Sequence, residues 1–289
     1  MNKSDLHIHS CFSDDGELSP EEIIDMAIKA GMDTIAITDH NSVKGIKRAI
    51  EYAKDKDINI IPGIEIDCTF NGINLHLLGY NIDFTNECFN KLEEDILAQE
   101  RAAAIKKIEK IKEVTNLELD ANEVLKKSHN GIVTGELIAE VLLENKENIK
   151  SPILKSYIEG GNRSDMPFVN FYWDYFSKGK PAYVDIKFIQ LKEAIRMIKE
   201  TNGISVIAHP GNNLKGNLEI IDDLIDEGID GIEVYSSYHS DEDIKYFFDK
   251  AVESNLIITC GTDFHGKNKP NIFIGDFKQK PEKIVDLVV

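Results

Sequence analysis

The segments DLHIHS (residues 5–10) and TIAITDHN (residues 34–41) decide how this chain folds. Each begins with apolar residues typical of a short strand and ends in polar residues that include histidine. Between them, Ser19-Pro20 followed by two glutamates has the pattern of a helix start, with Ser19 as the N-cap. Gly31 lies where that helix should end. The stretch therefore predicts a strand, a helix and a second strand.

The same alternation continues outward from this stretch and is interrupted once. A helix is expected over residues 43–54 and strands over residues 58–61, 182–184, 204–208, 231–235 and 257–260. Strands that alternate with helices favour a parallel sheet in an α/β fold. Residues 91–179 contain a long charged helix (93–113) and no comparable strand. We expect a barrel domain from residues 1–90 and 180–289, with a mainly helical insertion or cap at 91–179.

Composition narrows the classes of function. No run of about 18 apolar residues exists, and the first ten residues turn polar at once, so we expect no membrane span, no signal peptide and a cytoplasmic location. The formal net charge of −18 argues against binding of long nucleic acids, but not against a small phosphorylated substrate or a short RNA. The four cysteines contain no CxxC pair, which disfavours a zinc-thiolate site.

Histidines and carboxylates recur where the expected strands end. His7 and His9 lie two residues apart, so both side chains should point to one face. The other candidates are His40 in TDHN, Glu65 in PGIEID, His76 in NLHLLGY, His209 in AHPGN, and Asp263 with His265 in GTDFHG. Taken singly, each is as well explained by a polar cap or a solvated acid. Together at successive strand ends they favour a metal centre, and this ligand set suits Zn, Mn or Fe.

Three further residues have two interpretations each. Asp14 and Asp15 of SDDG are either loop acids that cap a turn or ligands beside His9, and Asp14 is the favoured ligand, with Asp15 as the alternative. His239, just after the strand expected at residues 231–235, either lines the pocket, where it would contact substrate, or lies outside it.

These segments together resemble the PHP (polymerase and histidinol phosphatase) family. DLHIHS, SDDGELSPEE, AITDHN, PGIEI, HLLGY, AHPG and GTDFHG stand in the order typical of that family. The resemblance implies a distorted (β/α)7 barrel that holds two or three divalent ions, commonly Mn, Zn or Fe. It implies one ion on His7, His9, Glu65 and Asp263, a second on Glu65, His76 and His209, and a third on Asp14, His40 and His265.

Within the family, the chain is similar to the branch that removes the 3′-phosphate from nucleoside 3′,5′-bisphosphates, whose close relatives also trim short RNA. That branch usually has Arg and His in the segment matching VTGELIAEVL (residues 133–142), and often Arg where this chain has Asn212. Substitute substrate contacts would come from His239, Asn212 and the bases Arg101, Lys178, Lys180 and Lys215, although each base is equally typical of an ordinary surface.

The ligand set predicts the chemistry. Two adjacent ions would bind a bridging water, held by Glu65 and Asp263 with His40 and His265 nearby, and the resulting hydroxide would attack phosphorus. The chain is thus expected to be a phosphatase acting on a small phosphate monoester, such as a nucleotide. The alternatives are a 5′-3′ exonuclease on short RNA, a histidinol-phosphate phosphatase and a noncatalytic metal-binding protein.

Overall fold

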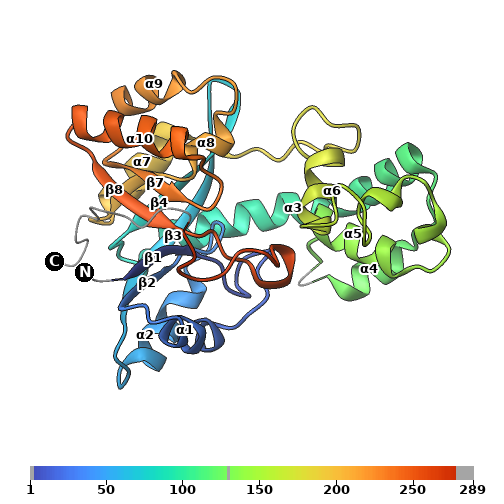
Figure 1. Cartoon of the computed structure of the whole chain (residues 1–289), viewed down its shortest axis with the longest axis horizontal. Helices are drawn as coiled ribbons and strands as arrows, with labels where there is room; N and C mark the ends of the chain where they lie inside the picture. The colour runs from blue at the N-terminus through green and yellow to red at the C-terminus, as the bar shows by residue number, and fades with distance from the viewer. Residues whose placement is uncertain (1–2, 129–130, 278–289) are drawn as a thin grey trace. The chain divides into compact units, whose positions relative to one another are not determined.

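The computed structural model describes residues 3–128 and 131–277 (Figure 1). The chain forms two compact units. The first comprises Met1–Leu92, Phe188–His265 and Ile272–Val289, and the second comprises Glu93–Lys187 with Gly266–Asn271. The second unit thus extends past the expected boundary at residue 179 and includes a short segment that follows the last strand.

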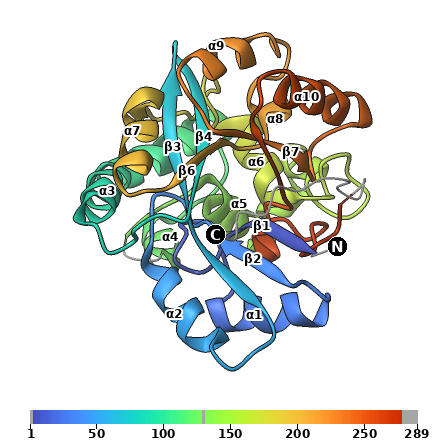
Figure 2. The same cartoon turned by 90° about the vertical axis from the view of Figure 1, so that its left-hand side faces the viewer.

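The strands of the first unit form one nearly closed sheet (Figure 2). They are β1 (Ser4–Ile8), β2 (Thr34–Ile37), β3 (Asn59–Phe70), β4 (Ile73–Tyr80), β5 (Ile189–Gln190), β6 (Ile204–Ile207), β7 (Gly231–Ser236) and β8 (Ile257–Gly261). Their order is β1-β2-β3-β4-β6-β7-β8, and β5 pairs with β3. The ends meet where the amide of His9 donates to the carbonyl of Phe264 at 2.9 Å and the amide of Asp263 donates to that of His7 at 2.8 Å.

The sheet departs from the expected parallel pattern at one hairpin. Strand β3 runs to Phe70 instead of ending near residue 61, and β4 returns antiparallel to both β3 and β6. Asn71 (φ 48°) and Gly72 (φ 79°) form the two-residue turn between them, and positive φ at both positions is what such a turn requires. Consequently Glu65 and His76 both lie inside strands and not at their ends.

A second expectation was also wrong. No strand forms at residues 182–184; the short β5 begins at Ile189 instead. The apolar Ala182 of this segment packs in the core of the second unit and does not belong to a strand of the sheet.

Helices lie outside the strands of the first unit (Figures 1 and 2). They are α1 (Pro20–Lys29), α2 (Lys44–Ala53), α7 (Leu191–Glu200), α8 (Pro210–Asn213), α9 (Ile220–Asp226) and α10 (Asp241–Glu253). The helix start expected at Ser19 is confirmed, since Ser19 and Glu22 form a reciprocal capping box. Gly31 follows the helix with φ 75°, a conformation that suits glycine.

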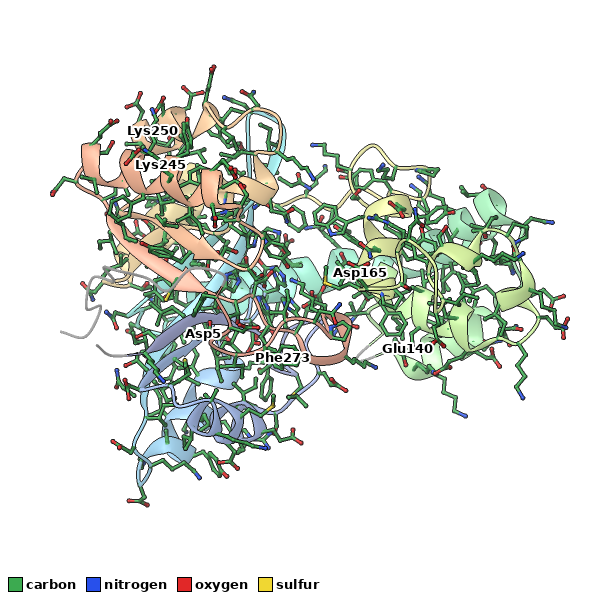
Figure 3. All side chains as sticks on the ribbon, in the orientation of Figure 1. Asp5, Glu140, Asp165, Lys245, Lys250 and Phe273 are labelled. Carbon is green, nitrogen blue, oxygen red and sulfur yellow. The ribbon has the colours of Figure 1, made fainter. Side chains whose placement is uncertain are left out.

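The second unit is helical and has its own apolar core. Its elements are α3 (Glu87–Thr115, which begins in the first unit), α4 (Ala121–Lys127), α5 (Gly135–Glu144), α6 (Pro167–Tyr175) and the 3₁₀ turns η1 (Asn148–Lys150), η2 (Leu154–Ser156) and η3 (Gly266–Asn268). Lys267 contacts Glu140 at 2.8 Å, and Asn271 donates to the carbonyl of Asp165 at 2.8 Å, which ties the returning segment to this unit (Figure 3). In the described part of the chain, no helix is both long and apolar enough to cross a membrane.

Candidate metal centre

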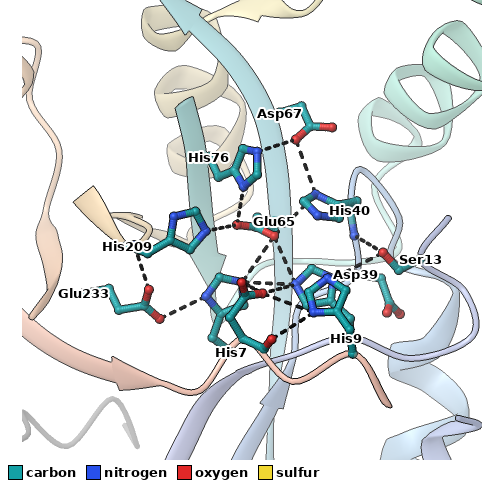
Figure 4. Close-up of polar contacts among 12 residues, drawn as sticks. His7, His9, Ser13, Asp39, His40, Glu65, Asp67, His76, His209 and Glu233 are labelled. Atoms are coloured by element: carbon teal, nitrogen blue, oxygen red, sulfur yellow. Dashed lines mark hydrogen bonds and ion pairs between the residues drawn. The ribbon is translucent and has the colours of Figure 1, made fainter. Parts of the chain in front are cut away.

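Four side-chain atoms converge from β1, β3 and the turn after β8 (Figure 4). His7 Nε2 lies 3.1 Å from His9 Nε2 and 3.2 Å from Glu65 Oε2. Asp263 Oδ1 lies 3.4 Å and 3.2 Å from the same two nitrogens, and Glu65 Oε2 lies 3.1 Å from His9 Nε2. These five separations, all between 3.1 and 3.4 Å, are of the size found between ligand atoms that surround one small divalent cation. The spacing therefore fits a metal ion.

The orientation of these atoms supports the same fit. Glu65 Oε2 is fully buried, yet it accepts no hydrogen bond from any residue that the structure describes. Leaving a buried carboxylate oxygen without a hydrogen bond is costly, so such an atom calls for another partner. His7 Nε2 and His9 Nε2 lie 3.2 and 3.1 Å from this oxygen, as ligands of a shared cation would.

The other oxygen of Glu65 faces a second group. Glu65 Oε1 lies 3.0 Å from His76 Nδ1 and 3.2 Å from His209 Nε2. One buried carboxylate thus presents each of its oxygens to a different set of histidines. This arrangement is suited to a carboxylate that bridges two ions.

A third group forms around Asp15 and corrects the choice made from the sequence. Asp15 Oδ2 lies 3.0 Å from His265 Nε2 and 4.0 Å from His40 Nε2, whereas the Asp14 side chain is exposed. Ser13 fixes the turn, because its hydroxyl donates to Asp15 Oδ1 at 2.9 Å and accepts from the amide of His40 at 3.3 Å. Asp15, and not Asp14, therefore joins the histidines.

Asp67 was missed by the sequence reasoning. Its Oδ1 lies 3.3 Å from His40 Nδ1 and 3.3 Å from His76 Nε2. Asp67 follows Glu65 by two residues on β3, so the period of two along a strand puts both carboxylates on one face. That signal was present, but the expected end of the strand near residue 61 hid it.

Glu233, Tyr238 and Asp5, which sequence reasoning also missed, support the centre from behind. The buried Glu233 on β7 contacts His7 Nδ1 at 3.0 Å through Oε1 and accepts the amide of His209 at 2.7 Å through Oε2. The Tyr238 hydroxyl donates to Asp263 Oδ2 at 2.6 Å. Asp5, labelled in Figure 3, accepts the amide and hydroxyl of Thr262 at 3.0 and 2.6 Å. Glu233 and Tyr238 thus orient the His7 and Asp263 side chains, and Asp5 holds Thr262, the residue before Asp263.

Two of the converging residues have strained backbones. His209 has φ 26° and Asp263 has φ 58°, in the region that residues other than glycine seldom adopt. The bond from the His209 amide to Glu233 and that from the Asp263 amide to His7 hold these conformations. Strain of this kind costs about 1–3 kcal/mol and is concentrated at functional sites.

The charges within the centre shift its pKa values. Burial raises the pKa of Glu65, but His7 and His40 lower it more, so it lies well below the usual range. Burial lowers the pKa of His7, yet Glu65 and Glu233 raise it well above the usual value. Burial and the neighbouring His265 lower the pKa of His9 to about 4. The centre therefore contains an ionised carboxylate in Glu65 and a neutral imidazole in His9, which are forms that bind metal, whereas the raised pKa of His7 favours its protonated ring.

The expected substrate contacts differ in their exposure. The expectation that His239 contacts substrate is corrected, because this side chain has no exposed surface. Its Nδ1 bonds the carbonyl of Val234 at 2.8 Å, and its Nε2 accepts the amide of Gly211 at 3.0 Å. It supports α8, which follows β6, and has no surface exposed to a substrate. Asn212 is half-buried in α8. The four bases are exposed, with Lys215 in the first unit and Arg101, Lys178 and Lys180 in the second.

Comparison with known proteins decides the family. A model of the PHP domain matches residues 5–227, more than half of the chain. The chain belongs to the PHP domain family. This PHP domain protein is similar, at 28% identity, to a 3′,5′-nucleoside bisphosphate phosphatase from Chromobacterium violaceum, with 97% of this chain and 93% of that protein covered. It is 30% identical to a 5′-3′ exoribonuclease from Haemophilus influenzae, with coverage of 91% and 90%.

Solved structures agree with this assignment. An amidohydrolase from Chromobacterium violaceum, with sulfate and no metal, matches with a TM-score of 0.79 at 26% identity, covering 97% of this chain and 92% of that one. A Bifidobacterium adolescentis protein assigned as a metal-dependent phosphoesterase matches with a TM-score of 0.73 at 25% identity, covering 96% and 92%. The expected family and the barrel-like fold class are confirmed. The PHP domain protein is a metal-dependent phosphoesterase.

Proposed function

We propose that this enzyme hydrolyses a phosphate monoester of a small nucleotide of the 3′,5′-bisphosphate class. One observation carries the proposal: Glu65 directs its two oxygens to two separate histidine groups, 3.2 Å from His7 Nε2 and 3.0 Å from His76 Nδ1. Phosphate ester hydrolysis needs charge neutralisation on both sides of the reacting phosphorus, and two adjacent cations provide it.

The residues that would hold the ions form three groups that share Glu65 or adjoin it. The groups are His7, His9, Glu65 and Asp263; Glu65, His76 and His209; and Asp15, His40 and His265, with His9 close to the last. Mn, Zn and Fe all accept this mixture of imidazole and carboxylate. Divalent ions bound there would activate water as the nucleophile and neutralise charge on the phosphate oxygens.

The chain itself supplies orientation. Tyr238 donates to Asp263 Oδ2, which leaves Oδ1 directed at His7 and His9. The buried Glu233 fixes the His7 ring through its Nδ1, so that Nε2 faces Glu65. With the ligands fixed in advance, less reorganisation is needed when substrate binds, and a preorganised site lowers the barrier for this reason.

The nucleotide substrate is supported by similarity to the bisphosphate phosphatase along nearly the whole chain. A second candidate is removal of nucleotides from short RNA, which the 30% identity to the exoribonuclease favours. Both substrates place a phosphate ester beside a ribose, so one metal centre suits either. The net charge of −18 opposes long RNA more than short RNA, because repulsion grows with the number of phosphates near the surface.

A substrate panel tests the proposal. The purified protein with Mn²⁺ would be assayed for phosphate release from adenosine 3′,5′-bisphosphate, histidinol phosphate and a chromogenic phosphomonoester, and for mononucleotide release from a 5′-phosphorylated short RNA. We expect the highest kcat/KM with the bisphosphate. Release of mononucleotides at a higher kcat/KM would favour the exoribonuclease, and no turnover with ions bound would overturn both candidates.

A further inference from the structure

We propose that Asp67 is a positioning residue that orients two ligand histidines, His40 and His76, belonging to two different metal groups. The inference rests on the metal-binding role in the proposed function and deepens it. On this proposal one carboxylate contacts a ring of the His76 group and a ring of the His40 group. Binding of an ion in one group would therefore depend on binding in the other.

Figure 4 shows Asp67 beside both His76 and His40. His76 turns Nδ1 to Glu65 Oε1 at 3.0 Å and Nε2 to Asp67 Oδ1 at 3.3 Å. His40 turns Nε2 toward Asp15 Oδ2 at 4.0 Å and Nδ1 to Asp67 Oδ1 at 3.3 Å. One oxygen of Asp67 thus contacts the outer nitrogen of both rings.

This contact has a defined consequence for metal binding. An imidazole that gives one nitrogen to an ion carries a proton on the other, and a carboxylate that accepts this proton fixes the tautomer and the ring orientation. It also makes the ligating nitrogen more basic. His40 Nδ1 lies 3.4 Å from Glu65 Oε2 as well, but that oxygen belongs to the first group. Asp67 Oδ1 is the carboxylate oxygen outside the groups that lies at ion-pair distance from both rings.

Asp67 is itself held in place. Asn41 Nδ2 donates to Asp67 Oδ2 at 2.7 Å, and the amide of Asp67 donates to Asn41 Oδ1 at 3.0 Å. The amide of Asn41 in turn donates to the carbonyl of Glu65 at 2.7 Å. Because Oδ2 is bound to Asn41, Oδ1 remains for the two rings. The carboxylate therefore has one orientation, set by the residue that follows His40.

A direct ligand role for Asp67 is the competing interpretation. An ion bound by His40 Nδ1, Asp67 Oδ1 and His76 Nε2 would use the only lone pair of the neutral His76 ring. His76 Nδ1 could then no longer serve the group that contains Glu65 and His209, although it lies 3.0 Å from Glu65 Oε1. The positioning role keeps that group intact, which is why we favour it.

Metal titration of Asp67→Asn tests the proposal. Apo protein would be titrated with Co²⁺, with the visible absorption spectrum and the number of bound ions per chain as readouts. We expect the number of ions at saturation to be unchanged, two of them to bind about 10–100-fold more weakly, and the ion on the His7 group to keep its affinity. A saturating number lower by one, with the others unchanged, would show that Asp67 is a direct ligand and overturn the proposal, as would unchanged binding throughout.

Two variants complete the experiment. Asn41→Gly removes the amide that holds Asp67 but tolerates the φ of 54° at this position, so it should weaken the same two ions to a smaller extent even if Asp67→Asn does not fold. Thr69→Ala, two residues further along the same face of β3, is the control and should bind Co²⁺ as the wild type does. Failure of the proposed activity would appear separately, as wild-type protein that binds ions but does not turn over substrate.

Discussion

Glu233 Oε1 lies 3.0 Å from Nδ1 of His7, and both side chains are fully buried. The second oxygen of Glu233 accepts the amide of His209. One carboxylate on β7 thus fixes the side chain of His7 and the strained backbone of His209. This contact explains how residues about two hundred positions apart acquire a common geometry.

Replacing Glu233 should therefore weaken metal binding without removing a ligand. In Glu233→Gln the amide oxygen can accept one of the two hydrogen bonds, but the amide NH2 is a donor and cannot accept the other. We expect metal affinity to fall about 10–100-fold and kcat/KM to fall with it. Metal titration and steady-state kinetics would measure both, with circular dichroism to establish folding; wild-type affinity in the folded variant would contradict this account.

The pair Asp14 and Asp15 offers a matched test of the third group. Asp15→Asn removes the charge that lies 3.0 Å from His265 Nε2, whereas Asp14→Asn alters an exposed side chain. We expect the first variant to lose most activity and to bind the ions less tightly, and the second to resemble wild type. Element analysis of both dialysed variants would decide; equal losses would mean that the turn is misassigned.

Tyr238 should matter through Asp263. Its hydroxyl donates to Asp263 Oδ2 at 2.6 Å, and hydrogen bonds to charged groups contribute about 1.5–3 kcal/mol. Tyr238→Phe should therefore weaken the ion on the His7 group by about 10-fold or more while leaving the fold intact. Competition with a chelator would measure the affinity. A Tyr238→Phe protein with unchanged affinity would show that Asp263 needs no such support.

Metal binding should release protons and strengthen as pH rises. Burial lowers the pKa of His7, but Glu65 and Glu233 raise it well above its ordinary value, and burial of His40 is likewise outweighed by Glu65 and Asp67. Without ions both rings are therefore protonated at neutral pH. An ion binds only the deprotonated nitrogen, so affinity must fall as pH falls.

Calorimetry in two buffers with different ionisation enthalpies would count the protons. The observed enthalpy of Mn²⁺ binding should differ between the buffers in the direction of proton release. The dissociation constant should increase between about pH 8 and pH 6 as the imidazoles retain their protons more strongly. An affinity that does not vary over this range would contradict the assignment of protonated histidines in the apo protein.

The ends of the strands could be predicted from the sequence, but the course of the sheet between them could not. DLHIHS and TDHN mark strand ends by a local change from apolar to polar residues, so His7, His9 and His40 were recognisable. The hairpin of β3 and β4 was missed because Glu65 and Asp67 interrupt its apolar pattern. Glu65 and Asp67 both face the candidate metal centre. The polar residues that made the strand hard to predict are therefore the ones proposed to support metal binding.

The supporting residues could not be predicted for a different reason. Glu233 and Asp5 are buried carboxylates whose partners lie far away in the chain, and nothing local distinguishes them from ordinary strand residues. Asp15 and Asp14 differ only in the direction that the turn gives them, which Ser13 sets through two hydrogen bonds. His239 seemed suited to the pocket in sequence terms, yet the backbone of α8 uses its Nε2.

The most direct measurement is metal content and turnover of His9→Ala and Asp263→Asn, the latter chosen because asparagine tolerates the positive φ at this position. Their wild-type counterparts contribute two of the four atoms that converge on one point between β1, β3 and the turn after β8. We predict that each folded variant binds fewer ions than wild type and shows no detectable phosphate release from adenosine 3′,5′-bisphosphate. Wild-type metal content and activity in both would contradict the central claim.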